Sequence, residues 1–228
     1  MKAIIFDKDG TLLAYDPFWV AVADAALAAL SLRRGLGQYL DVMKRALGLR
    51  GNATEKNCVL QRGTFGQMAE AINTALENAK SPARVSGREI ETVFAESTQF
   101  GTVCPACEGL QPLMKRLQDK GYDLFLVTTD IPVITYRCLD ALGITGCFRE
   151  IIADDGVLPP KPDPAAIHYL LKKYGLQPDE ICMVGDTQTD MLFAQAGGIL
   201  GICVGGGAFE NMGRIQIPDV SYLETVIE

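Results

Sequence analysis

Two carboxylates stand close together at the end of a short apolar run near the start of the chain. The run covers residues 3–6, and Asp7, Lys8, Asp9 and Gly10 follow it. Four apolar residues that end abruptly in polar and glycine positions are typical of a strand buried on both faces of a parallel sheet. Ligands bind at the carboxyl ends of such strands, so Asp7 and Asp9 are candidates for chemistry. An Asp-Gly pair also marks ordinary turns, and this segment alone leaves both interpretations open.

Four more polar residues occupy similar places, just beyond an apolar run or in the loop that follows one. Thr128 follows residues 124–127, Asp186 follows 182–184 with one glycine between, Asp190 comes four residues later, and Lys161 lies in the loop after 151–153. In a parallel sheet these loops emerge at one edge, so the side chains can converge. Taken singly, each has a structural explanation as a strand-end hydroxyl, a solvated lysine or a helix-capping acid.

Strand and helix patterns alternate over the second half of the chain. Helices are predicted over 108–120, 130–142, 163–174 and 189–196, and strands over 122–127, 150–153, 181–184 and 199–204. Strands that alternate with helices of about 10–15 residues indicate a parallel sheet. The predicted fold is therefore α/β, with a Rossmann-like, doubly wound parallel sheet.

The segment behind the first strand has a different character. Helices are predicted over 18–32, 36–47, 65–79 and 87–97, with no convincing strand between them. Such a helical block is typical of an inserted subdomain. The predicted domains are thus a catalytic core of residues 1–14 and 99–228, and an all-helical insertion of residues 15–98.

The four ordered segments together resemble the haloacid dehalogenase superfamily of hydrolases. They are Asp7-Lys8-Asp9-Gly10-Thr11, Thr128, Lys161-Pro162, and residues 185–190 with the sequence GDTQTD. The resemblance implies that Asp7 is a nucleophile that forms an aspartyl-phosphate, and that Asp9 is the general acid and base. Because dehalogenases of the superfamily need no second acid, Asp9 favours phosphoryl transfer.

The same resemblance implies the remaining contacts to phosphate and metal. Thr128, Thr129, Gly10 and Lys161 would contact the phosphoryl group, and Lys161 would also keep Asp7 ionised. A magnesium ion would be held by Asp7, the backbone carbonyl of Asp9 and Asp186, with Asp190 as a support or further ligand.

The insertion resembles the C1-type cap of the phosphoglycolate phosphatase and β-phosphoglucomutase branch, whose caps contact the leaving group. It holds 10 Lys+Arg against 9 Asp+Glu, which leaves 11 against 19 for the core. The cap is therefore the less repulsive part for an anionic substrate. Arg50, Lys56 and Arg62 are candidate substrate contacts, and a solvated loop explains them equally well.

These features predict a Mg²⁺-dependent phosphatase for a small phosphate monoester, similar to phosphoglycolate phosphatases. A phosphotransferase of the phosphomutase type shares every core motif and remains an alternative. A module that binds a phosphate ligand without catalysis is a third, although such a module is expected to have lost Asp7, Asp9, Lys161 or Asp186, and all four are present.

Composition limits the partners and the compartment. A net charge of -7 and a pI near 4.8 argue against nucleic acid as a partner. The sequence shows no apolar stretch near 18 residues and no signal-peptide core, so neither a membrane span nor export is expected. Seven cysteines, an odd number, indicate buried thiols in the cytoplasm.

Three further residue types have mainly structural interpretations. Cys104 and Cys107 form a lone Cys-x-x-Cys pair at the return from the insertion, where zinc or redox chemistry is a minor alternative. Trp19 is interpreted as an anchor of the first helix of the insertion, and His168 as a structural or surface residue.

Overall fold

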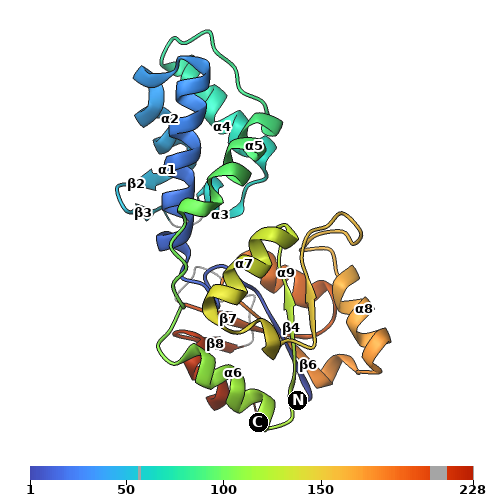
Figure 1. Ribbon diagram of the computed structural model, residues 1–228. Coiled ribbons are helices and arrows are strands. Elements are labelled where there is room, and N and C mark those ends of the chain that lie inside the picture. Colours follow the sequence, from blue (N-terminus) through green and yellow to red (C-terminus); the bar gives the residue numbers. More distant parts are fainter. Residues whose placement is uncertain (56–57, 206–214, 228) are drawn as a thin grey trace. The chain divides into compact units, whose positions relative to one another are not determined.

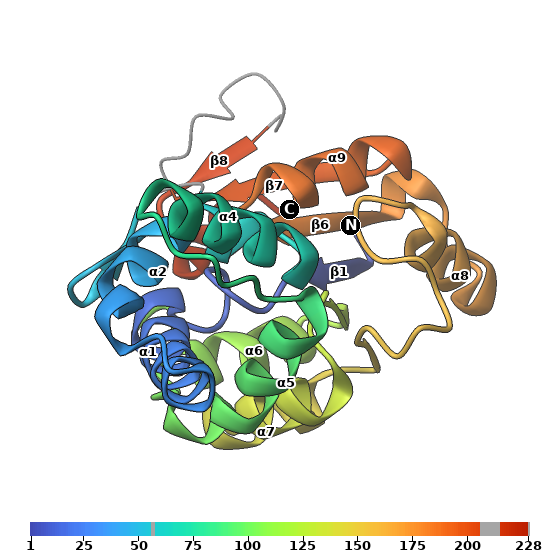
Figure 2. The same ribbon diagram turned by 90° about the horizontal axis from the view of Figure 1, so that it is seen from above.

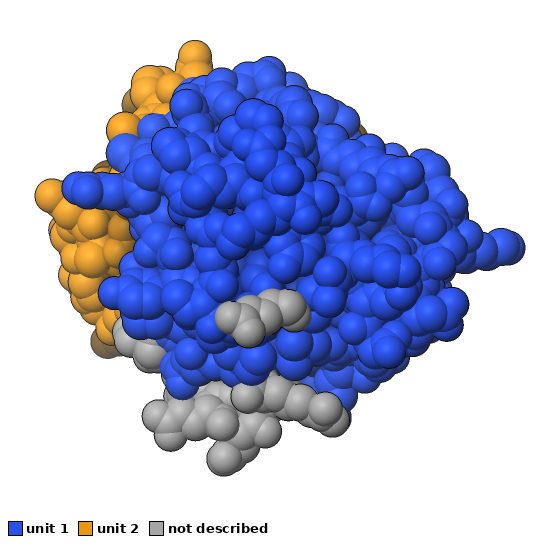
Figure 3. Space-filling view, turned by 90° about the horizontal axis from the view of Figure 1, so that it is seen from below, with its two compact units in different colours: residues 1–14, 103–228 blue, residues 15–102 orange. Residues whose placement is uncertain are grey.

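The computed structural model describes residues 1–55, 58–205 and 215–227, which form two compact units. Met1–Ala14 and Val103–Glu228 make up the first unit, and Tyr15–Thr102 makes up the second (Figure 3). The return to the first unit thus falls after residue 102, where the sequence predicted 98. Thr102 still belongs to the helical unit because its N–H donates to the Pro17 carbonyl oxygen (3.2 Å).

A six-stranded parallel sheet forms the centre of the first unit. Its strands stand in the order β5-β4-β1-β6-β7-β8, and each neighbouring pair is parallel. The predicted α/β class with a parallel, doubly wound sheet is confirmed. The edge strand β8 was not predicted. The bounds are β1 (Ala3–Phe6), β4 (Asp123–Val127), β5 (Glu150–Ile152), β6 (Ile181–Gly185), β7 (Leu200–Val204) and β8 (Ile215–Ile217).

Helices cover both faces of this sheet. On one face, Ile5, Phe125 and Met183 of the strands pack against Ile167 of α8 and Phe193 of α9 in a buried cluster. The helices α6 and α7 lie on the opposite face (Figures 1 and 2). Both faces of β1 are therefore buried, which explains its run of four apolar residues. The helices are α6 (Leu110–Asp119), α7 (Pro132–Leu142), α8 (Ala165–Tyr174) and α9 (Gln188–Ala196), with 3-10 turns at Thr145–Cys147, Pro178–Glu180 and Val220–Thr225.

The second unit is a bundle of helices with one very short hairpin. Its elements are α1 (Tyr15–Arg34), α2 (Leu40–Leu47), β2 (Leu49–Arg50), β3 (Ala53–Thr54), α3 (Val59–Arg62), α4 (Phe65–Asn78) and α5 (Gly87–Ser97), with 3-10 turns at Gly37–Tyr39 and Thr98–Phe100. The prediction of an all-helical insertion is wrong at this hairpin. Gly51, with φ of +61°, allows the turn that pairs Arg50 with Ala53, and strands of two residues leave no periodicity in a sequence.

Helix α1 is the long central element of the second unit. By length and composition alone it is apolar enough to cross a membrane, with a mean hydropathy of 1.2, contrary to the expectation from the sequence. Half of that apolar window is buried within the protein. Trp19 is buried in it and stands edge-on to Phe18 (ring centroids 5.2 Å apart), which agrees with its interpretation as an anchor.

The two chain segments that lead to and from the helical unit run side by side within the first unit. Ala14 donates its N–H to the Cys104 carbonyl oxygen, and Ala106 donates to that of Leu12, both at 2.9 Å. Leu13 and Pro105 form an antiparallel bridge between them. The insertion therefore leaves and rejoins the first unit at adjacent points.

Candidate active site

Polar side chains from four loops meet at the carboxyl edge of the parallel sheet. Asp7 directly follows β1, Thr128 follows β4, Lys161 lies in the loop after β5, and Asp186 follows β6. The Asp7 N–H donates to the Val184 carbonyl oxygen (2.9 Å), which continues the β1–β6 pairing to the strand tip. The parallel register thus brings residues that lie up to 179 positions apart to one edge.

Lys161 joins two carboxylates at this edge. Its Nζ lies 2.5 Å from Asp7 Oδ1 and 2.6 Å from Asp190 Oδ1, and all three side chains are almost completely buried. Burial works to lower the pKa of Lys161, but the two carboxylates outweigh it and raise that pKa above its usual value. The lysine therefore carries a fixed positive charge beside Asp7.

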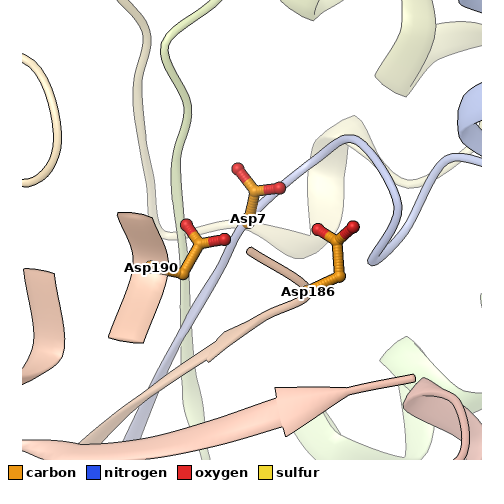
Figure 4. A group of neighbouring side chains, drawn as sticks. All are labelled: Asp7, Asp186 and Asp190. Carbon is orange, nitrogen blue, oxygen red and sulfur yellow. The ribbon is translucent and has the colours of Figure 1, made fainter. Parts of the chain in front are cut away.

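Three aspartates crowd together around this point. One carboxylate oxygen from each of Asp7, Asp186 and Asp190 lies within 4.8 Å of the others, and the three side chains face a common space (Figure 4). Burial raises the pKa of Asp7 to about 7, although Lys161 opposes the shift, and burial with the charges of Asp7 and Asp190 raises that of Asp186. Buried carboxylates that raise one another's pKa are stabilised by a divalent cation, so the donor set fits Mg²⁺.

The two oxygens of Asp190 already have partners within the chain. Oδ1 contacts Lys161, and Oδ2 accepts from the N–H (3.1 Å) and the hydroxyl (2.5 Å) of Thr187. The hydroxyl of Thr187 in turn accepts from the Asp190 N–H, which completes a capping box at the start of α9. Both oxygens of Asp190 therefore have partners within the chain, Lys161 and Thr187, and its expected role as a support for the metal or a further ligand stays a prediction.

Gly10 lets the loop after β1 pass close to Asp186. Its φ is +80°, and a Cβ at this position would fall 2.0 Å from Asp186 Oδ2. The hydroxyl of the next residue, Thr11, donates to Asp186 Oδ1 (3.4 Å). Only glycine satisfies both the conformation and the close approach, and its contact with phosphate stays a prediction.

A second buried lysine was not predicted to have any role. The side chain of Lys8 is 0% exposed, and its Nζ lies 2.7 Å from Asp9 Oδ1 and 3.0 Å from Asp130 Oδ2. Burial raises the pKa of Asp130 to about 6, while Lys8 acts to lower it. Lysine is almost never fully buried unless it is paired, so its place two residues beyond a buried strand, between two aspartates, was a usable signal for this cluster.

Thr128 is connected to the same cluster through the loop after β4. It is buried, and its Oγ1 accepts from the Asp130 N–H (3.2 Å). Thr129, the other predicted phosphate contact in this loop, is exposed. The contacts of both residues with substrate stay predictions.

Three residues of the helical unit were predicted to contact substrate, and the structure describes two of them. Arg50 pairs with Glu55 (2.7 Å) and donates to the Leu49 carbonyl oxygen. Arg62 is the last residue of α3, and Lys56 lies outside the described residues. Their role in substrate binding stays a prediction.

The cysteines and the histidine outside this edge are structurally simple. All seven cysteines, Cys104 and Cys107 included, are free thiols. In the described part of the chain, the group of acidic, cysteine or histidine side chains close enough to share a metal ion is the aspartate cluster, so the zinc alternative for Cys104 and Cys107 gains no support. His168 is exposed on α8, as expected for a surface residue.

Comparison with known proteins identifies the family. The family model of haloacid dehalogenase-like hydrolases matches residues 1–198. The chain belongs to this family. The prediction of an enzyme of this superfamily is therefore confirmed, and the four segments from which it was made lie at the sheet edge described above.

Curated relatives in this family carry the name phosphoglycolate phosphatase. The one from Pseudomonas savastanoi pv. phaseolicola is 28% identical over 213 residues, which covers 93% of this chain and 72% of the relative. The one from Aliivibrio fischeri is 27% identical over 206 residues and is covered to 81%, with 87% of this chain.

Solved structures share the whole fold at lower identity. A predicted phosphoglycolate phosphatase from Haemophilus somnus aligns with a TM-score of 0.72 and 20% identity, covering 100% of this chain and 98% of that one. A HAD phosphatase from Thermococcus onnurineus aligns with a TM-score of 0.68 and 22% identity, covering 99% of this chain and 97% of that one. At these identities the likeness shows the fold alone.

Proposed function

We propose that this protein is a Mg²⁺-dependent phosphatase that hydrolyses a small phosphate monoester through an aspartyl-phosphate on Asp7. The observation that carries the proposal is the contact of Lys161 with Asp7 beside Asp186. It supports the proposal because a buried lysine beside two neighbouring carboxylates suits a nucleophile at Asp7 and a metal contact at Asp186. The curated relatives named phosphoglycolate phosphatase support a substrate of that kind, an alkyl phosphate whose small leaving alcohol carries a carboxylate.

In the first step an oxygen of the Asp7 carboxylate attacks phosphorus, and the bond from phosphorus to the ester oxygen breaks. Asp9 donates a proton to the departing oxygen, which leaves as an alcohol. The ammonium of Lys161 offsets the negative charge that develops on the phosphoryl oxygens, and the Thr128 hydroxyl donates to one of them. Because Lys161 contacts Asp7 already, this charge needs no rearrangement when substrate binds.

In the second step water attacks the phosphorus of the aspartyl-phosphate. Asp9, now ionised, accepts a proton from this water, and the bond between phosphorus and the Asp7 oxygen breaks. Inorganic phosphate leaves, and Asp7 and Asp9 return to their starting forms. Asp7, Asp186 and the Asp9 carbonyl oxygen would hold a magnesium ion, whose positive charge would let an anionic nucleophile approach an anionic phosphate.

A panel of phosphate esters assayed with Mg²⁺ or with chelator tests the proposal. The native protein is expected to release inorganic phosphate only with Mg²⁺, and Asp7→Asn is expected to be inactive. Asp155→Asn, which changes an exposed aspartate in the loop after β5, is the matched control and keeps full activity. Activity of Asp7→Asn equal to that of the native protein would refute the mechanism.

The fate of the phosphoryl group separates the alternatives. A phosphomutase would need a bisphosphate for activation and would return a phosphorylated sugar, whereas a phosphatase gives free phosphate. Binding of esters without turnover, in the presence of Mg²⁺, would instead indicate a non-catalytic phosphate-binding module. As part of the same proposal, the protein acts in the cytoplasm, which the free thiols of all seven cysteines support.

A further inference from the structure

The cluster of Lys8, Asp9 and Asp130 connects the proposed acid and base to the loop that carries Thr128. Asp9 belongs to the loop after β1, and Asp130 to the loop after β4. Lys8 joins the two because its ammonium contacts one carboxylate oxygen of each, at 2.7 and 3.0 Å. The contact with Asp9 is also a hydrogen bond to a single atom, Oδ1, which limits rotation of the carboxyl group.

Asp130 is itself held firmly, so it can serve as an anchor for the lysine. Its N–H donates to Thr128 Oγ1 (3.2 Å), and its carbonyl oxygen accepts from the Asp154 N–H (2.8 Å). Its Oδ2 is buried and accepts no hydrogen bond from the described residues, so the nearby Lys8 ammonium is what compensates its charge. The two side chains therefore depend on each other for their burial.

We propose that Lys8, anchored by Asp130, is a positioning residue that holds the Asp9 carboxyl group in place for proton transfer to the leaving group. The inference rests on the proposed phosphatase function, because it assigns Asp9 to that reaction. Lys8 does not touch the reacting atoms in this role. It acts through Asp9, and its loss is expected to resemble the loss of Asp9.

The loss of kcat/KM on different leaving groups shows whether Lys8 positions Asp9 or only stabilises the fold. An alkyl alkoxide needs a proton in order to depart, whereas 4-nitrophenolate departs as a stable anion. The ratio kcat/KM reports only the steps up to the first irreversible one, which here is departure of the leaving group. General acid catalysis contributes about 10²–10⁴-fold, so a misplaced Asp9 lowers kcat/KM for alkyl phosphates far more than for 4-nitrophenyl phosphate.

The experiment compares kcat/KM for 4-nitrophenyl phosphate and for the alkyl phosphate that the native enzyme hydrolyses best. We expect Lys8→Met to lose at least about 10-fold more on the alkyl ester than on 4-nitrophenyl phosphate. Asp9→Asn is expected to show the same split. Adding Lys8→Met to Asp9→Asn should cause little further loss of kcat/KM, because the effects of two substitutions that act through the same group are not additive.

Two variants serve as controls. The double variant Lys8→Met/Asp130→Asn removes the ammonium together with one of its two carboxylates, so it keeps the proposal testable if Lys8→Met does not fold. It is expected to show the same split between esters. Lys173→Met removes a lysine from an ion pair with Glu150 on the outside of the same unit and should leave both activities unchanged.

Three outcomes would overturn the inference. They are an equal loss on both esters, no loss on the alkyl ester, and a Lys8→Met loss that multiplies with that of Asp9→Asn. In each of these cases the native enzyme still hydrolyses esters, so the proposed function stands. A native enzyme that hydrolyses neither ester with Mg²⁺ would refute the proposed function and the positioning role together.

Discussion

The negative charge of Asp7 is expected to destabilise the folded protein when no divalent cation is bound. Its pKa is about 7, against an ordinary value of 3.8. At about 1.4 kcal/mol per pKa unit, this difference corresponds to about 4 kcal/mol at pH 8, where the carboxyl group is ionised in both the folded and the unfolded state. In Asp7→Asn the amide carries no charge, and Lys161 keeps Asp190 as its partner.

We therefore expect Asp7→Asn to be inactive yet more stable than the native protein at pH 8 in the presence of chelator. We expect the free energy of unfolding to rise by about 2–4 kcal/mol. The range extends below 4 kcal/mol because a buried amide without its full set of hydrogen bonds is itself destabilising. In a domain of this size it corresponds to a rise in melting temperature of about 4–16 °C.

The pH dependence of this gain follows from the direction of the pKa shift. Between pH 7 and pH 4 the folded Asp7 takes up a proton before the unfolded one does, so the unfavourable contribution of its charge shrinks as pH falls. Below about pH 4 the group is neutral in both states and the contribution is absent. The stability advantage of Asp7→Asn should therefore be full at pH 8, decline as pH falls through about 7, and disappear near pH 4.

Urea unfolding at pH 8, 6 and 4.5, with chelator throughout, measures this effect. Asp155→Asn, at an exposed position, is the matched control and should change the free energy of unfolding by less than about 0.5 kcal/mol. If Asp7→Asn is less stable than the native protein at pH 8, or if its advantage does not depend on pH, the assignment of a raised pKa to Asp7 is wrong.

Three other predictions concern neighbouring residues. Mg²⁺ at about 100 times its Kd should raise the free energy of unfolding of the native protein by about 2.7 kcal/mol, and Asp186→Asn should lose most of this gain in the same urea titration. Gly10→Ala should destabilise the protein by about 1–3 kcal/mol and remove ester hydrolysis, because its Cβ would collide with Asp186; normal activity would contradict the close approach. Lys8→Met should lower the free energy of unfolding by about 3–5 kcal/mol, with a smaller loss in Lys8→Met/Asp130→Asn; equal losses would show that Asp130 does not depend on the lysine.

The sequence was most informative where a residue follows a buried strand. Asp7, Thr128 and Asp186 come directly after apolar runs or one residue beyond them, and the parallel sheet brings such positions together whatever their distance along the chain. The position of Lys161 in the loop after a predicted strand made it a candidate, but its contact with Asp7 was expected only from the family resemblance, because a loop of prolines has no periodicity that indicates where a side chain points. Strand β8 was not predicted because Ile215–Ile217 has one polar residue between two apolar ones, which is too short an alternation to indicate a strand.

The sequence was least informative where side chains from different loops pair. The sequence pattern predicts a helix from residue 130, whereas α7 begins at Pro132 and Asp130 lies in the loop beside Lys8. Nothing in the order of residues shows that Lys8 reaches across to the loop after β4. Similarly, one carboxylate oxygen of Asp190 contacts Lys161 and the other accepts from Thr187. The spacing of residues in the sequence does not show in which direction such a side chain points.

The paired segments around Leu13 and Pro105 have a consequence for how such an enzyme can change. Because the helical unit leaves and rejoins the first unit at neighbouring hydrogen-bonded positions, two short antiparallel segments connect it to the sheet, whatever the length of chain between them. The inserted segment can be lengthened, rebuilt or exchanged with little entropic penalty to the sheet, since that penalty grows only slowly with loop length. The architecture thus lets the helical unit diversify while the carboxyl edge of the sheet stays fixed.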